Sequence, residues 1–376
     1  MSMQIEIANS FAQIEPTEWN ALTDGSPVLN HHLFSAMEAT GCIGADSGWQ
    51  PYPIVVKEEG RVVGVSPLFL KSHSYGEYVF DWSWADAYER NGIPYYPKLL
   101  TAIPFTPVSG SRLMSTKPEI RLLMSQVIVQ QMQEHGLSSA HILFTDDLDS
   151  ELLRQQGWLE RAGVQFRWQN EKFADFDDFL SRLAHDKRKK IHQERRKITE
   201  AGIMVRRLQG MEISEADWDF FYICYRNTYH QHHSSPYLNR DFFTEIGHRL
   251  KDHILLIIAE RNGQPIATAF NFYDAHSLFG RYWGAIEYIP GLHFELCYYQ
   301  AQEFCIAQGI QYFEGGAQGE HKLARGFLPR ATHSFHQIAH PEFDRAIRDF
   351  VSREAGQMEI YHHELEERAP FKKLEI

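Results

Sequence analysis

Residues 26–34 read SPVLNHHLF and residues 235–243 read SPYLNRDFF, so one motif occurs twice in this chain of 376 residues. Four further pairs of segments repeat in the same order, at offsets that drift as insertions and deletions in loops would make them. They are residues 14–19 and 213–218, the strand pairs around Gly60 and Gly263, the strand ends at Trp84-Ala85 and Trp283-Gly284, and residues 157–161 and 326–330. Because chance matches would not keep this order, the sequence predicts two diverged copies of one unit of roughly 170 residues.

The composition is that of a globular protein with two hydrophobic cores, since 43% of the residues are hydrophobic and 13% aromatic. The four cysteines show no CxxC spacing, which disfavours a disulfide framework and a cysteine zinc site. Residues 1–16 lack the features of a signal peptide, and the longest apolar run is Ile254–Ala259, so we expect a cytoplasmic protein without a transmembrane segment. A formal net charge of −12 disfavours DNA as a partner.

Both halves predict the same succession of strands and helices. The second half has a three-strand meander, then a helix that Gly309 ends, then a short buried strand; these lie at residues 254–259, 265–273, 277–283, 294–308 and 310–313. The first half matches it at residues 52–57, 61–70, 77–84, 121–135 and 140–144. The pattern predicts an α/β fold with a mixed, mostly antiparallel sheet flanked by helices in each half. We expect domains at residues 1–170 and 203–376, joined by residues 171–202.

The joining segment predicts a strongly basic helix. Seven cationic and two anionic side chains lie between Asp186 and Lys197, beside a thin apolar seam. One interpretation is a solvated surface helix, because runs of charge usually lie on the surface. The other is a helix that contacts the phosphates of RNA, for which the candidates are Lys187, Lys190 and Arg195.

Three segments resemble those of a known family: DWSWA at residues 81–85, GRYWG at 280–284 and EGGAQGEHK at 314–322. They look like the FemAB-like group of peptidoglycan biosynthesis or recognition proteins. The meander, helix and strand of each half resemble the GNAT N-acyltransferase domain, and Lys322–Phe327 is similar to the lysine-x-glycine-phenylalanine motif of Fem-type transferases, with one residue more. The resemblance implies two tandem GNAT-like domains that transfer an acyl group to an amine.

The resemblance implies aminoacyl-tRNA as donor in the Fem branch and acyl-CoA in the GNAT branch. A GNAT domain holds the CoA pyrophosphate in a glycine-rich turn at a helix N-terminus. The corresponding segments, residues 86–94 and 285–293, each have one glycine and a proline that lacks an N–H. We therefore expect aminoacyl-tRNA as donor, no permanently bound cofactor, and an amine-bearing small molecule or cell-wall precursor as acceptor. An acetyl-CoA-dependent N-acetyltransferase and a non-catalytic protein that binds a cell-wall or peptide ligand are the alternatives.

Aminolysis needs a base for the amine and a stabilising group for the tetrahedral oxyanion. Residues 314–322 concentrate such groups among three glycines. We predict Glu320 or His321 as the general base and Lys322 as the cation for the oxyanion or a substrate phosphate; a tight turn with surface charges is the alternative. Glu295 is a further candidate base, or else half of a buried ion pair with Arg281.

Further residues are predicted to bind substrate. Arg281 and Trp283 end the third meander strand, and Asp81 and Trp84 are expected at the same place in the first half, although such aromatics commonly lie in a core. Lys98 and Arg112 belong to a proline-rich insertion and are expected to hold a phosphate or carboxylate. The full predicted set is Asp81, Trp84, Tyr96, Lys98, Arg112, Arg281, Trp283, Glu314 and Gln318. No metal site is expected, because the neighbouring histidines of residues 230–233 would point in different directions on a helix.

Overall fold

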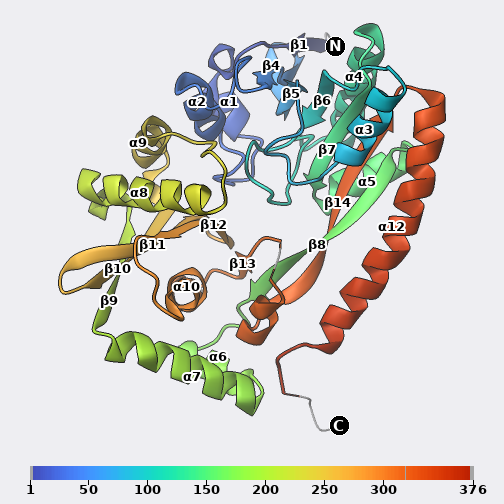
Figure 1. The fold of residues 1–376 in the computed structure, drawn as a ribbon. Coiled ribbons are helices and arrows are strands. Elements are labelled where there is room, and N and C mark those ends of the chain that lie inside the picture. The colour runs from blue at the N-terminus through green and yellow to red at the C-terminus, as the bar shows by residue number, and fades with distance from the viewer. Residues whose placement is uncertain (1–2, 318, 373–376) are drawn as a thin grey trace. The chain divides into compact units, whose positions relative to one another are not determined.

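The computed structural model describes residues 3–317 and 319–372. Its internal contacts define two compact units (Figure 1). Unit 1 takes the chain up to Gly163 together with Ala331–Ile360, and unit 2 takes Val164–Arg330 together with the chain from Tyr361. Two long strands, β8 (Leu159–Gln169) and β14 (Leu328–Ile338), carry the chain from one unit into the other.

Unit 1 contains two sets of hydrogen-bonded strands. The first is an antiparallel sheet in the order β1-β3-β4, and the second has the order β2-β5-β6-β7-β14, in which only β6 and β7 are parallel. The strands are β1 (Met3–Ile7), β2 (Trp49–Pro51), β3 (Ile54–Glu58), β4 (Arg61–Ser66), β5 (Leu68–Lys71), β6 (Lys98–Thr101) and β7 (Ser139–Thr145). The helices are α1 (Pro16–Asn20), α2 (His31–Ala39), α3 (Trp82–Arg90), α4 (Pro118–Glu134), α5 (Asp147–Gln155) and most of α12 (Pro341–Glu367), with a 3₁₀ turn at Phe11–Gln13.

Unit 2 has strands in the order β8-β13-β12-β11-β10-β9, in which only β12 and β13 are parallel. They are β9 (Ile203–Gln209), β10 (Ile254–Arg261), β11 (Gln264–Tyr273), β12 (Ser277–Ala285) and β13 (Tyr312–Glu314). The helices are α6 (Phe176–Arg182), α7 (His185–Glu200), α8 (Glu215–Gln231), α9 (Arg240–Arg249), α10 (Leu292–Phe294) and α11 (Gln300–Gln308), with a π-helical turn η4 (Glu295–Tyr299) between the last two. Short 3₁₀ helices are η2 (Gly210–Glu212), η3 (Lys251–His253) and η5 (Glu320–Arg325).

The repeated sequence motif has the same structural role in both units. Asn30 caps α2 and Asn239 caps α9, each by accepting a hydrogen bond from a backbone N–H in the first turn. The tryptophan of the preceding helix, Trp19 or Trp218, then packs against a phenylalanine of the capped helix, with ring centroids 5.7 and 6.3 Å apart. The motif therefore sets the packing of a helix pair in each unit.

The meander of unit 2 is buried on both faces. Residues Ile254–Ala259 of β10 are all fully buried. Helix α8 packs against β11 and β12, while η4 packs against β10 and β11. Alternate residues Leu255 and Ile257 share a core cluster with Leu296 of η4. Burial on both faces explains why the strand is a continuous apolar run rather than an alternating one.

The structure confirms the predicted meander of the second half as β10, β11 and β12, and Gly309 ends α11 with a φ of +69°. In the first half the third predicted strand, residues 77–84, is wrong. Trp82–Arg90 form helix α3, because Trp84 and Tyr88 lie four residues apart and are both buried on one face of that helix. The predicted strand at residues 61–70 is divided at Pro67, which lacks the N–H that a continuous strand needs.

Two segments lie in different units from those expected. Ala331–Ile360 belong to unit 1, because β14 pairs with β7 through contacts such as Phe335 opposite Ile142. The basic helix α7 is part of unit 2, because Ile191 and Ile198 are buried in the core of that unit. Among the described residues, every helix is too short or too polar to cross a lipid bilayer.

Gly284 gives a direct test of the packing of α8 on β12. A Cβ at this position would lie 2.1 Å from the carbonyl oxygen of Cys224, a backbone atom of α8 that has no freedom to move aside. We expect Gly284→Ala to lower the free energy of unfolding by about 3 kcal/mol, measured by urea titration. Gly356→Ala, where a Cβ meets nothing within 4 Å, is the control and should raise it by about 0.5–1 kcal/mol, since α12 is helical there. Equal stabilities of the two variants would contradict this packing.

Candidate active site

Two hollows lie in unit 2 where β12 meets the segment that leads into α10. The first, here called the turn hollow, has a volume of about 360 Å³ and is lined by residues of α8, the end of β12 and residues 285–294. The second, here called the lysine cavity, has a volume of about 180 Å³ and is lined by β11, β12, the α10–η4 helix and Lys322. Trp283 and His293 line both hollows, so these two side chains separate them.

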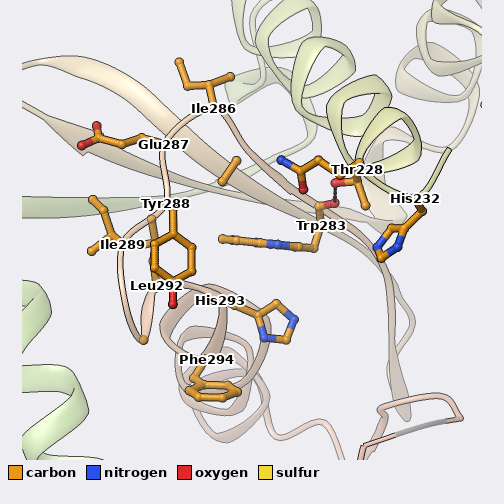
Figure 2. Close-up of a pocket in the computed structure, with 13 residues that line it drawn as sticks. Thr228, His232, Trp283, Ile286, Glu287, Tyr288, Ile289, Leu292, His293 and Phe294 are labelled. Carbon is orange, nitrogen blue, oxygen red and sulfur yellow. Dashed lines mark hydrogen bonds between the residues drawn. The ribbon is translucent and has the colours of Figure 1, made fainter.

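Figure 2 shows the turn hollow, with the rings of Trp283, Tyr288 and His293 around it. The Thr228 hydroxyl on α8 donates a hydrogen bond of 2.7 Å to the carbonyl of Trp283, which fixes the end of β12 against that helix. Tyr288 is 89% exposed, so its ring is available to a ligand. The hollow thus presents a fixed indole and a solvent-facing phenol.

The lysine cavity exists because the sheet opens between β12 and β13. These strands pair only from Ser277 to Phe279 on β12, and beyond that point β12 pairs with β11 alone. A β-bulge follows at once, since Phe270 pairs with Tyr282 and Asn271 with Gly280, leaving Arg281 as the extra residue. Such a bulge redirects a side chain out of the normal alternation of a strand.

Lys322 is nearly buried, with 6% of its surface exposed. Its Nζ donates hydrogen bonds to the carbonyls of Ala317, at 2.8 Å, and Gly316, at 3.3 Å. Burial lowers the pKa of Lys322 to about 8. Gly319 and Gly326 flank the short helix η5 with φ values of +100° and +86°, which glycine alone adopts without strain. The glycine-rich segment therefore lets the chain turn sharply enough to place the ammonium group in the cavity.

Two histidines stand beside this lysine. Nε2 of His321 lies 3.0 Å from the hydroxyl of Tyr298, and His293 packs edge-on against Trp283 and Tyr298. Burial lowers the pKa of His293 to about 4, helped by the positive charges of His321, Arg325 and Lys322. Burial and the charges of Lys322 and Arg325 also lower the pKa of His321. Both imidazoles are therefore mainly neutral at pH 7 and able to accept a proton.

Arg325 holds this segment in place. Only 2% of it is exposed, and its guanidinium donates to the Glu194 carboxylate at 2.8 and 2.9 Å and to the hydroxyl of Tyr299 at 3.0 Å. A further bond of 2.7 Å goes to the carbonyl of His321, and the guanidinium lies 3.5 Å from the ring centroid of Phe294. One side chain thus joins α7, the α10–η4 helix and η5.

The sequence matches a family model described as FemAB-like, peptidoglycan biosynthesis/recognition, over residues 10–373. The chain belongs to this family. No curated protein matches the sequence. Among solved structures, FemX is 11% identical and matches over 93% of this chain and 100% of its own, with a TM-score of 0.56. L-PGS from Bacillus licheniformis is 10% identical over 91% of this chain and 97% of its own, with a TM-score of 0.54.

The C-terminal domain of a putative lysylphosphatidylglycerol synthetase from Agrobacterium fabrum is 8% identical over 91% of this chain and 97% of its own, with a TM-score of 0.56. At such identities the likeness shows the fold alone: two units, each with a mixed sheet flanked by helices. The fold class expected from the sequence is confirmed.

The structure brings Arg281, Trp283 and Lys322 of this FemAB-like protein together around the lysine cavity. Glu314 lies on β13, where Nε of Arg167 donates to it at 2.6 Å and burial raises its pKa. Gln318 and the side chain of Glu320 lie outside the described residues. His293, which lines both hollows, was missed by the sequence analysis; a histidine directly after the turn and beside Phe294 was the available signal.

Glu295 pairs with Arg195 of α7 rather than with Arg281. The guanidinium of Arg195 donates to both carboxylate oxygens of Glu295, at 3.0 and 3.2 Å, and to Glu303 at 2.5 Å. The reason is that η4 presents this carboxylate to α7. Arg195 is accordingly engaged within unit 2, whereas Lys187 pairs with Asp186 at 2.8 Å and Lys190 is exposed.

Three predicted residues of unit 1, Asp81, Tyr96 and Lys98, share one hydrogen-bonded network. Lys98 is fully buried and its Nζ donates to Asp81 at 2.5 Å, to Glu77 at 2.8 Å and to Ser74 at 2.8 Å. The hydroxyl of Tyr96 joins it 2.8 Å from Ser74, and the nearby Trp84 ring packs edge-on against His336. Arg112 lies in a different network.

The guanidinium of Arg112 donates to the carbonyls of Leu143, at 2.9 Å, and Val108, at 2.5 Å. Arg112 and Lys98 therefore donate to separate sets of protein groups, and no described hydrogen bond joins their two networks.

Glu194→Gln tests the role of the Arg325 ion pair. Removing the charge leaves a buried guanidinium without its counter-ion, so we expect the free energy of unfolding to fall by about 3 kcal/mol in a urea titration. Glu200→Gln on the same helix is the matched control, because its pair with Arg196 is exposed, and it should change stability by less than about 0.5 kcal/mol. Similar small effects of both substitutions would show that Arg325 does not organise the site.

Proposed function

We propose that this FemAB-like protein is an N-acyltransferase that transfers an aminoacyl or other acyl group to an amine, with the reacting atoms at the lysine cavity. The observation that supports it most is Lys322, an ammonium group placed in a cavity beside two largely neutral histidines. This set supplies a cation for an oxyanion and a base for an amine, which are the two requirements of aminolysis. The family description supports a role in peptidoglycan chemistry.

In the proposed reaction, the amine attacks the carbonyl carbon of the acyl donor and forms the new C–N bond. Lys322 stabilises the negative charge that develops on the carbonyl oxygen. His321, positioned by Tyr298, takes the proton from the attacking nitrogen and gives it to the leaving oxygen or sulfur as the C–O or C–S bond to the donor breaks. Glu320 remains a predicted alternative for this base.

We propose aminoacyl-tRNA as the donor. The turn hollow offers the rings of Trp283 and Tyr288, on which a nucleobase can stack. Pro290 lacks an N–H, which disfavours a pyrophosphate in the same turn, and Glu287 of this turn pairs with Arg261 at 2.5 Å. On α7 the surface proposed to meet RNA phosphates is the face at Arg188, Lys189, His192 and Arg196, which lines a hollow.

The proposed acceptor is the amine of a peptidoglycan precursor or of another small molecule, in the cytoplasm. Lys322→Met is expected to reduce kcat of transfer about 100-fold, because the oxyanion loses its cation. The measurement is release and transfer of a labelled acyl group, with charged tRNA and acyl-CoA as parallel donors. Unchanged transfer by Lys322→Met would remove the lysine from the mechanism.

The pH profile gives a second test. Lys322 is cationic only below its pKa of about 8, so transfer should decline above that pH. The contribution of Lys322 to the free energy of unfolding should instead rise with pH between about 8 and 10.5. In that range the unfolded chain binds a proton that the folded protein lacks, so rising pH favours folding. Lys322→Arg keeps its charge at every accessible pH and should remain active into the alkaline range, though with a lower rate. An alkaline decline that is the same in both proteins would show that another group titrates.

A further inference from the structure

The segment between β5 and the first turn of α3, here called the aromatic loop (residues 72–83), exposes four large aromatic side chains. The exposed fractions are 57% for Tyr75, 38% for Tyr78, 58% for Phe80 and 37% for Trp82. The ring centroids of Tyr75 and Trp82 lie 4.9 Å apart, so these two rings belong to one patch. A contiguous exposed apolar patch of this kind marks an interaction surface.

The charged residues of the aromatic loop are turned into unit 1. The loop contains no lysine or arginine, and its two acidic residues, Glu77 and Asp81, are buried. The ammonium group of Lys98 donates to both carboxylates, at 2.8 and 2.5 Å. His73 is half-buried, and burial lowers its pKa, so its ring is mainly neutral at pH 7. The outer surface of the loop is therefore aromatic and uncharged, the reverse of an ordinary surface loop.

The backbone of the aromatic loop is fixed to the rest of unit 1. The carbonyl of Tyr75 accepts hydrogen bonds from Nε1 of Trp49, at 3.2 Å, and from Nζ of Lys71, at 3.3 Å. Gly76 has a φ of +80°, and a Cβ at this position would lie 2.6 Å from the ring of Phe105. Because the backbone is held in this way, the exposed rings are preorganised to meet a partner.

The area of the patch restricts what that partner is. Aromatic side chains bury roughly 150–250 Å² each, so the four exposed fractions together correspond to roughly 300–500 Å². A stable protein–protein interface buries about 800 Å² on each partner, which is more than this patch offers.

The chemistry of the patch distinguishes a lipid surface from a saccharide. A sugar ring requires several directional hydrogen bonds, whereas the exposed side chains of the loop other than the four rings are those of Ser72 and Ser83. The interface of a lipid bilayer has no such requirement, and tryptophan and tyrosine are enriched there. The patch therefore fits a bilayer interface better than a sugar.

We propose that the aromatic loop docks on a lipid surface, where Tyr75, Phe80 and Trp82 lie among the headgroups of a zwitterionic bilayer. A formal net charge of −12 disfavours an anionic surface, and the loop itself has no lysine or arginine to attract one. Docking of this kind is peripheral and reversible, because its strength scales with the small apolar area that enters the interface. The inference goes beyond the proposed acyl transfer and does not depend on it, since the loop belongs to unit 1 and the lysine cavity to unit 2.

The test is co-sedimentation of the full chain with vesicles of phosphatidylcholine, alone or mixed with phosphatidylserine. We expect binding to the phosphatidylcholine vesicles that high salt does not weaken and that phosphatidylserine does not strengthen. The double variant Tyr75→Ser with Phe80→Ser should lower the partition coefficient at least tenfold. Both side chains are exposed, so this variant should keep its fold, which its thermal unfolding midpoint checks.

Met211→Ser with Ile223→Ser is the matched control, because it removes two side chains of unit 2 that are each more than half exposed. It should bind vesicles as the unchanged protein does. Absence of binding to phosphatidylcholine, equal binding by the loop variant, or binding that needs phosphatidylserine and is lost in high salt would overturn the inference. If phosphatidylcholine vesicles do not bind while the loop variant abolishes dimerisation in sedimentation velocity, or abolishes calorimetric binding of an N-acetylglucosamine oligomer, the patch serves a second copy or a saccharide instead.

Discussion

The contact between Arg325 and Glu194 is the interaction on which the candidate site depends. A guanidinium that is 2% exposed cannot remain charged without a counter-ion and filled hydrogen bonds. Glu194, Tyr299 and the carbonyl of His321 supply them, and Phe294 covers its face. These groups come from α7, the α10–η4 helix and η5. The contacts of the Arg325 guanidinium therefore hold these three elements together. Because His321 and Lys322 belong to η5, the same contacts position these two residues.

Several buried charges of the protein have structural partners. Lys98 with Asp81 in unit 1, and Arg195 with Glu295 in unit 2, are paired within the protein and hold elements together. Lys322 differs from them, because its described hydrogen bonds go to carbonyl groups in a cavity and burial brings its pKa to about 8. Perturbed groups that line a cavity are characteristic of functional sites. We therefore propose the chemistry for unit 2 and a structural role for the network of unit 1.

Much of this arrangement was predictable from local sequence patterns. The apolar run of β10, the glycine after α11 and the repeated SPxLN motif act through strand burial, helix ending and helix capping, which are local effects. The glycine-rich segment before Lys322 likewise suggested the candidate site. The strand predicted at residues 77–84 was wrong because the helical spacing of Trp84 and Tyr88, which places both on the buried face of α3, was not used. Ion-pair partners such as that of Glu295 join residues a hundred positions apart, and no local pattern encodes them.

The most direct test of the account is the pKa of Lys322 in the folded protein. Lysine side-chain signals, carbon-13 labelled by reductive methylation, are followed by NMR across the alkaline range, and Lys322→Arg assigns the signal that disappears. We expect titration near 8, well below that of the exposed lysines, because Lys322 is buried. Titration at the ordinary value of about 10.4 would show that Lys322 is a solvated surface group and would contradict the proposed site.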